Sequence, residues 1–175
     1  TTLTAKMCVS QQEIVLDEIT LAKLGYKNDA PDECLRSHGR LLNKAVLRLN
    51  PDNLMETLCS TKGKILVDVS IDSADAVTLI LNAIDFLNYS EVTSILAIPG
   101  GSNSTFIREQ AKLFQALKPQ LALTKLDECD LSSSEVSEFF LNSMKIHYLT
   151  GSKSIIGSLS GCTADILTQY LIENC

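Results

Sequence analysis

The sequence predicts an α/β fold of three layers, in which a mainly parallel sheet is flanked by helices. Short apolar runs of strand length alternate along the chain with longer segments of helical period, a pattern typical of parallel α/β layering. Of the 175 residues, 45% are hydrophobic and 21% are charged, which is enough to fill a core and to cover it. At this length we expect a single domain spanning residues 1–175.

Each element follows from the local pattern. In the first half, apolar runs predict strands at 18–23, 45–49 and 65–69, and helical periodicity predicts helices at 2–16, 32–43 and 52–60. In the second half, strands are predicted at 93–98, 121–125 and 145–149, and helices at 73–87, 104–117, 133–143 and 163–173. Turn residues such as Asn50-Pro51, Pro99-Gly100-Gly101 and Lys118-Pro119 fall between these segments. A Gly/Ser-rich connection at 150–161 precedes the last helix.

Composition excludes several classes of function. Fifteen Lys and Arg against 21 Asp and Glu give a net charge of −6, which is the wrong sign for a nucleic-acid partner. No stretch approaches the roughly 18 consecutive apolar residues that a membrane helix needs. The six cysteines form no C-x-x-C pair, so we expect most of them to be small core residues in a protein of the reducing cytoplasm. With two histidines, a histidine-rich metal site is excluded.

The most specific motif is Thr124-Lys125-Leu126-Asp127, at the end of an apolar strand. It matches the Thr/Asn-Lys-x-Asp pattern that reads guanine. A carboxylate at Asp127 can accept two N–H donors from the guanine edge, and the aliphatic stem of Lys125 can lie along the base. In open α/β sheets, ligands bind outside the carboxyl ends of the strands. Because four-residue patterns also arise by chance, the alternative is an ordinary strand-to-loop exit with solvated charges.

The motifs taken together resemble those of the GTPases of the signal-recognition-particle (SRP) class, and within that class the flagellar-placement GTPase FlhF. Thr1-Thr2-Leu3-Thr4-Ala5-Lys6 resembles the residues that follow Gly-Lys in the family's phosphate loop. Further along the chain, the family's motifs are matched in order by Tyr26-Lys27 (Asp-Thr-Tyr-Arg), Asp68 (Asp-Thr-Ala-Gly-Arg), Thr124–Glu128 (Thr-Lys-Leu-Asp-Glu) and Tyr148–Gly151 (the final nucleotide loop). The resemblance spans essentially the whole chain and implies a P-loop NTPase-like G domain.

This resemblance implies GTP or GDP as the ligand. The residues expected to bind the nucleotide are Thr1, Thr2, Lys125, Asp127, Thr150, Gly151 and Ser152. The Thr1 hydroxyl and Asp68 are the expected ligands of Mg²⁺, and Asp68 is also the one candidate catalytic residue. The phosphate loop would precede residue 1, so we expect the chain to be a fragment. For Thr1 and Thr2 the alternative is a simple helix N-cap.

Departures from the family's motifs count against magnesium binding and hydrolysis. Leu24-Gly25 stands where the family has Asp-Thr, and leucine offers no oxygen to a hard cation. Ile71 replaces a glycine that lets a backbone N–H approach the γ-phosphate, and Asp72 puts a negative charge where an arginine would stabilise phosphoryl transfer. We therefore expect a pseudo-GTPase that binds guanine nucleotide weakly or not at all.

By resemblance, such a domain acts through regulated protein association. The implied partners are a second copy or another SRP-class GTPase, together with membrane-linked machinery that places or assembles a flagellum or a related structure. The implied location is the cytoplasm or the inner face of the cell membrane. Two alternatives stay open: a genuine slow Mg²⁺-dependent GTPase, and a scaffold that binds no nucleotide. The Gly-rich segment 99–104 lacks the spacing of a phosphate loop and is interpreted as an ordinary loop.

Overall fold

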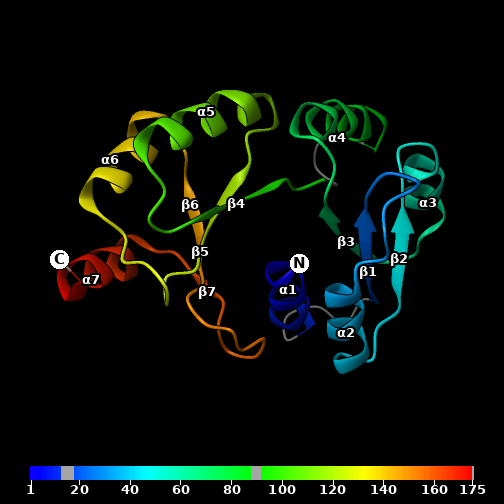
Figure 1. Cartoon of the computed structure of the whole chain (residues 1–175), viewed down its shortest axis with the longest axis horizontal. Helices are drawn as coiled ribbons and strands as arrows, with labels where there is room; N and C mark the ends of the chain where they lie inside the picture. Colours follow the sequence, from blue (N-terminus) through cyan, green and yellow to red (C-terminus); the bar gives the residue numbers. More distant parts are fainter. Residues whose placement is uncertain (13–17, 88–91, 175) are drawn as a thin grey trace. The chain divides into compact units, whose positions relative to one another are not determined.

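The computed structural model describes residues 1–12, 18–87 and 92–174 (Figure 1). The chain forms two compact units, the first made of Thr1–Leu79 with Ile155–Gly157 and the second of Ile80–Ser154 with Ser158–Cys175. The division falls inside the helix Ser73–Leu87. The expectation of a single domain over residues 1–175 is not tested by this division and stays a prediction.

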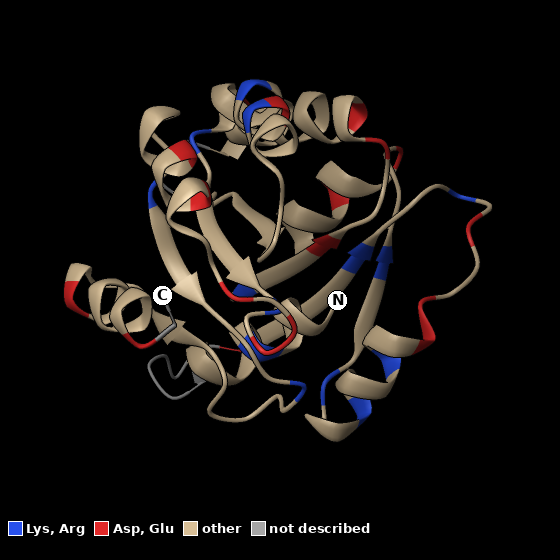
Figure 2. Ribbon diagram, turned by 60° about the vertical axis from the view of Figure 1, so that its left-hand side comes forward, with Lys and Arg blue, Asp and Glu red and all other residues tan. Residues whose placement is uncertain are grey.

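The sheet of the first unit has three parallel strands in the order β2-β1-β3. They are β1 (Ile19–Leu24), β2 (Val46–Leu49) and β3 (Lys64–Val69). The register aligns Arg48, Lys23 and Asp68 in one row near the carboxyl ends of the strands. Figure 2 shows the basic residues at the ends of β1 and β2 next to each other. This row places two basic side chains and one carboxylate next to each other near the carboxyl ends of the three strands.

Helices cover both faces of this sheet. They are α1 (Thr2–Gln12), α2 (Glu33–Leu41), α3 (Leu54–Ser60) and α4 (Ser73–Leu87). On one face Cys8 of α1 packs in a core cluster with Leu21. On the other face Leu54 of α3 packs with Ala22 and Leu49. Because Leu21 and Ala22 are successive strand residues and point in opposite directions, the first unit has the predicted helix, sheet and helix layers.

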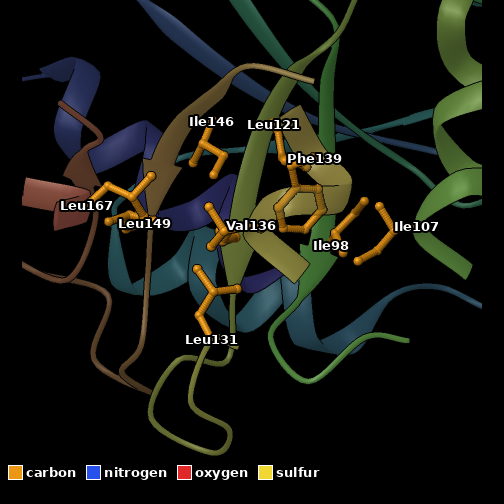
Figure 3. Packing of buried hydrophobic residues seen from close by; sticks show 10 residues of the cluster. Ile98, Ile107, Leu121, Leu131, Val136, Phe139, Ile146, Leu149 and Leu167 are labelled. Atoms are coloured by element: carbon orange, nitrogen blue, oxygen red, sulfur yellow. The ribbon is translucent and has the colours of Figure 1, made fainter. Parts of the chain in front are cut away.

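The second unit has a sheet in the order β4-β5-β6-β7, in which β7 alone is antiparallel to its neighbour. Its strands are β4 (Ile95–Pro99), β5 (Gln120–Thr124), β6 (Ile146–Leu149) and β7 (Ser160–Gly161). Its other helices are α5 (Ser104–Phe114), the 3₁₀ turn η2 (Gln115–Leu117), α6 (Ser133–Leu141) and α7 (Ala164–Asn174). Phe139 of α6 points toward Leu121 of β5 and Ile98 of β4, and Ile107 of α5 and Leu167 of α7 join the same cluster (Figure 3).

The predicted helices and strands are confirmed with shifted ends. The third helix begins at Leu54 rather than at residue 52, because the side chain of Asn50 accepts hydrogen bonds from the amides of Asp52 and Asn53 and holds a turn there. The helix predicted at 104–117 ends at Phe114 and continues as a 3₁₀ turn. Residues 13–16 of the first predicted helix lie outside the described residues.

Two expectations need correction. Strand β7 was not predicted, since Ser160-Gly161 has no apolar pattern and pairs with β6 only through tertiary contacts. The expectation that most cysteines are core residues is wrong for the five that the structure describes. Cys8 is buried, Cys162 is half-buried, and Cys34, Cys59 and Cys129 are exposed free thiols. The short segments around these three cysteines are polar, which counts against burial.

Candidate functional site

The first candidate site is a charged cluster at the carboxyl end of the first unit's sheet, made of Thr1, Lys23, Asp32 and Asp68 (the Lys23 cluster). The ammonium Nζ of Lys23 lies 2.8 Å from Oδ2 of Asp32 and 3.0 Å from Oδ2 of Asp68. The Thr1 hydroxyl oxygen lies 2.6 Å from the same Asp68 oxygen and 3.2 Å from the same Asp32 oxygen. A hydroxyl has one proton, so Thr1 donates to one carboxylate at a time.

Local structure positions each member of the Lys23 cluster. Lys23 and Asp68 are register partners on the neighbouring strands β1 and β3, one residue before each strand ends. Asp32 is the N-cap of α2, where its Oδ1 accepts a hydrogen bond of 2.9 Å from the amide of Leu35. Its second oxygen, Oδ2, is left to face Lys23. Thr1 immediately precedes α1, so the cluster joins two strands and two helix starts.

The electrostatics of the cluster favour its charged form. The side chains of Lys23, Asp32 and Asp68 are 19%, 19% and 13% exposed. Partial burial by itself raises the pKa of Asp32, but the hydrogen bond and charge of Lys23 outweigh it and lower that pKa from 3.8 to about 2. Burial by itself raises the pKa of Asp68, but the hydrogen bond and amino charge of Thr1, together with the hydrogen bond and charge of Lys23, outweigh it and lower that pKa. The pKa of Lys23 is raised, because its two carboxylate partners outweigh the cost of burial.

The Lys23 cluster does not fit a magnesium ion. Mg²⁺ needs several oxygen ligands at about 2.0 to 2.1 Å in an octahedral arrangement. Thr1 and Asp68 are close together, as expected of two metal ligands, but the oxygens that would face a metal are in contact with the Lys23 ammonium. Leu24 and Gly25, which follow Lys23, are buried and bring no side-chain oxygen. Among the described residues, no group of three or more His, Cys, Asp and Glu side chains is arranged to hold a metal.

A cavity of about 410 Å³ opens beside this cluster and is lined in part by Lys23, Asp32, Arg48 and Ser70. The guanidinium of Arg48 is held at the wall of this cavity, because it donates hydrogen bonds to the backbone carbonyls of Tyr26, Lys27 and Asp29. It fixes the turn that follows β1.

The third-motif residues that depart from the family's pattern have structural roles. Ile71 packs against the core cluster of the first unit. Asp72 accepts a hydrogen bond of 2.9 Å from the amide of Ala74 at the start of α4, as expected for a carboxylate near a helix N-terminus. Asp75, in the first turn of α4, accepts a hydrogen bond of 2.6 Å from the hydroxyl of Tyr26.

The second candidate site is a pair of loops at the carboxyl ends of β5 and β6 in the second unit. The amide of Leu126 donates to the carbonyl of Thr150 over 3.3 Å, and the amide of Thr150 donates to the carbonyl of Leu123 over 2.9 Å. Lys125 adopts a left-handed backbone with φ of 59°, which turns the chain sharply after the strand. The structure thus brings together the two segments, 124–127 and 150–152, that the sequence separates.

Gly151 is the tightest point of this loop pair. A methyl group built on it would lie 3.0 Å from the amide nitrogen of Asp127 and 3.0 Å from the carbonyl carbon of Leu126. Both neighbours are backbone atoms, so a side chain at this position would require the Leu126–Asp127 backbone to shift by a few tenths of an ångström. The side chains of Lys125 and Asp127 are exposed, and Lys125 lies 3.5 Å from Glu128. In the described part of the chain, Asp127 has neither a hydrogen-bond partner nor an ion-pair partner for its carboxylate.

A second cavity of about 410 Å³ adjoins the loop pair. Its walls combine apolar side chains with hydroxyl groups, and they include Leu126, Thr150, Gly151, Ser152, Ile166 and Tyr170. Lys125 and Asp127 do not line it. The hydroxyl of Ser152 accepts a hydrogen bond of 3.1 Å from the amide of Ser154, so one of its acceptor positions is used within the loop.

The remaining predicted residues are placed as follows. Thr2 is exposed in the first turn of α1 and is not part of the Lys23 cluster. The segment Pro99 to Ser102 packs against the 124–129 loop, and Gly100 donates its amide to the carbonyl of Thr124 over 2.8 Å. This contact agrees with its interpretation as an ordinary loop.

Sequence reasoning missed Lys23 and Asp32. Lys23 carries a detectable signal, since it is a charged residue one position before the end of an apolar strand. Asp32 was noted only as the start of a predicted helix.

Comparison with known proteins gives a clear result at the level of the fold. No protein-family model matches the chain, and no curated protein matches it in sequence. FlhF complexed with GMPPNP and Mg²⁺ matches it with a TM-score of 0.72 and 18% identity, over 97% of this chain and 68% of FlhF. Chloroplast FtsY from Physcomitrella patens matches with a TM-score of 0.74 and 14% identity, over 97% of this chain and 61% of FtsY.

The 54 kDa signal recognition particle protein from Aeropyrum pernix K1, in complex with GDP, matches with a TM-score of 0.65 and 12% identity, over 97% of this chain and 43% of that protein. The chain therefore has the fold of the GTPase domains of the SRP class, an α/β P-loop NTPase fold with parallel sheets flanked by helices. The resemblance to SRP-class GTPases and to FlhF is confirmed at the level of structure. Within the described ranges, no helix has both the length and the apolar character required to cross a membrane.

Proposed function

We propose that this protein is a pseudo-GTPase of the SRP-class fold, which binds guanine nucleotide weakly, does not hydrolyse it, and acts by regulated association with other proteins. The observation that carries the proposal is the close contact of Gly151 with the Leu126–Asp127 backbone, beside an exposed Asp127 carboxylate. This contact fixes the loop that bears a guanine-reading motif while leaving the carboxylate available to a ligand.

The base-reading chemistry is present in the second unit. An ionised Asp127 accepts two N–H donors from the edge of guanine, and adenine does not offer that pair of donors. The exposed stem of Lys125 can cover one face of the base. FlhF has been seen in complex with GTP and Mg²⁺, which supports a guanine nucleotide as the ligand class.

In the described residues of the first unit, the third motif and the Lys23 cluster do not favour hydrolysis. Phosphoryl transfer depends on positive charge placed around the transferring phosphate. At the third motif Ile71 packs against the core cluster and Asp72 accepts a hydrogen bond at the start of α4, so neither supplies that charge. The Lys23 ammonium is held by the carboxylates of Asp32 and Asp68.

A domain that binds nucleotide without hydrolysing it acts through the surfaces it presents. We place this association in the placement or assembly of a flagellum or a related membrane-linked structure, as a homodimer or with another SRP-class GTPase. The fold match to FlhF and FtsY supports this role. Exposed apolar side chains at the end of α6, Phe140 at 68% and Leu141 at 79%, are available for a protein contact.

The proposal is tested by titrating the full-length protein with fluorescent GTP and ATP analogues. We expect the GTP analogue to bind with a Kd of roughly 10 to 100 µM and the ATP analogue at least about tenfold more weakly. Asp127→Ala should remove the difference. The matched control is Asp130→Ala, which deletes an exposed carboxylate of the same loop and should leave both affinities unchanged. Binding of neither analogue, or equal binding of both, would show that the motif does not read guanine.

A further inference from the structure

The Lys23 cluster contains a cation of its own. Two carboxylate oxygens, Asp32 Oδ2 and Asp68 Oδ2, converge on one ammonium at 2.8 and 3.0 Å and on one hydroxyl at 3.2 and 2.6 Å. Lys23 has three N–H donors, and two of them are directed at these oxygens. Each member comes from a different element, so the four residues converge only in the folded chain.

Because Lys23 is attached to the chain, its ammonium competes for the two carboxylates more effectively than a dissolved ion does. Its neighbours Ala22 and Leu24 are buried in the sheet, with exposed fractions of 0% and 1%, which anchors the stem of Lys23 at the end of β1. A group held in place by the fold acts at a high effective concentration. A magnesium ion would have to displace this ammonium and give up part of its own hydration shell to reach the same oxygens.

We propose that Lys23 is a built-in cation that takes the place of a divalent metal ion between Thr1, Asp32 and Asp68. The protein therefore takes up no Mg²⁺ at this position, and the cluster acquires affinity for a divalent ion when the ammonium is removed. In Lys23→Met the two carboxylates and the Thr1 hydroxyl are left facing each other without the lysine ammonium. Three oxygen ligands supplemented by water are a suitable set for Mg²⁺ or Mn²⁺.

The test uses the full-length protein without nucleotide, so its outcome is separate from that of guanine binding. Mn²⁺ uptake is followed by electron paramagnetic resonance of the free ion, and thermal unfolding is measured with and without millimolar MgCl₂. Wild type should leave Mn²⁺ free and show the same Tm in both buffers. Lys23→Met should have a Tm lower by about 4 to 8 °C in metal-free buffer, regain part of it with MgCl₂, and bind about one Mn²⁺.

Two further variants make the result specific. Lys64→Met removes a lysine from β3 whose ammonium contacts Gln11 rather than a carboxylate, and it should gain no Mn²⁺ affinity. Lys23→Met combined with Asp68→Asn should lose the Mn²⁺ binding that Lys23→Met gains. If Lys23→Met is unfolded without metal, circular dichroism shows whether MgCl₂ restores its structure, and restoration supports the proposal.

Three outcomes would overturn the proposal. One is Mn²⁺ binding by wild type that Asp68→Asn abolishes, since the site would then accept a metal with the lysine in place. The second is the absence of any gain in metal affinity or metal-dependent folding in Lys23→Met. The third is an equal gain in Lys64→Met, which would make the effect one of net charge rather than of this cluster.

Discussion

Gly151 sets the geometry of the candidate base site through the absence of a side chain. Its Cα faces the backbone of the residue pair Leu126–Asp127, and a methyl group there would lie 3.0 Å from backbone atoms. Gly161, which follows in the same unit, has open space around the same position. The two glycines therefore separate the effect of crowding from that of losing a glycine.

From this contrast we predict that Gly151→Ala displaces the Leu126–Asp127 loop. The variant should lose about 1 to 3 kcal/mol of stability through overpacking and bind the fluorescent GTP analogue several-fold more weakly. Gly161→Ala should change neither quantity beyond experimental error. Urea unfolding and nucleotide titration measure both. Equal behaviour of the two variants would mean that the contact at residue 151 is not a constraint.

Asp32 gives a prediction about acid stability. Its pKa in the folded protein, about 2, lies below its ordinary value of 3.8, so the folded state binds this proton less readily than the unfolded chain. The stabilisation is therefore complete above the ordinary pKa and is lost as the pH falls from about 3.8 to about 2.

Asp32→Asn isolates this charge, because asparagine is an equally good N-cap and keeps the start of α2 intact. We expect the variant to be less stable than wild type at neutral pH and to show a flatter pH dependence when unfolding is followed from about pH 5 down to about pH 2. Asp130→Asn, in an exposed loop, is the control and should follow wild type. A wild-type slope retained in Asp32→Asn would argue against the Lys23 ion pair.

At the scale of elements, the capping residues determine where a helix begins. α6 begins with a capping box, in which the Ser132 hydroxyl accepts from the amide of Glu135 and the Glu135 carboxylate accepts from the amide of Ser132. Val136 and Phe139, one turn further on, are buried in the core of the second unit. The cap therefore sets where the apolar face of α6 meets the sheet.

We predict that Ser132→Ala lowers the stability of the protein by about 1 kcal/mol, since it leaves the amide of Glu135 without its acceptor. Ser133→Ala, at the next position and exposed, is the matched control and should lie within about 0.5 kcal/mol of wild type. Chemical unfolding followed by circular dichroism compares them. A loss in Ser133→Ala as large as that in Ser132→Ala would show that the box does not contribute.

Sequence reasoning succeeded for these elements and failed where distant segments meet. The strands and helices were predictable because apolar period and turn residues are local properties. The contact between residues 124–127 and 150–152 was predictable too, since both follow strands and parallel strands end at the same edge. The Lys23 cluster was not, because Thr1, Lys23, Asp32 and Asp68 lie on four elements and their convergence depends on tertiary structure. Strand β7 was missed for the same reason.

At the scale of the whole molecule, the fold is that of GTPase domains, whereas the residues at the first candidate site do not favour hydrolysis. The fold matches SRP-class GTPase domains over 97% of the chain at 18% identity or less in the three proteins compared. The second unit carries the Thr124–Asp127 pattern, which we propose recognises guanine, on a tightly packed loop. The first unit places Lys23, Ile71 and Asp72 where the resemblance implies a metal site and groups that assist hydrolysis. Folds are shared by many functions, so the residues of the site carry the functional conclusion.

Our central proposal is that this protein binds guanine nucleotide without hydrolysing it. The most direct test is to incubate the full-length protein with GTP and MgCl₂, and to measure bound nucleotide and released phosphate in the same sample over several hours. We predict that GTP is recovered intact from the protein and that phosphate release does not exceed the rate of buffer alone. Magnesium-dependent phosphate release that Asp127→Ala abolishes and Asp130→Ala preserves would contradict the claim and identify a slow GTPase.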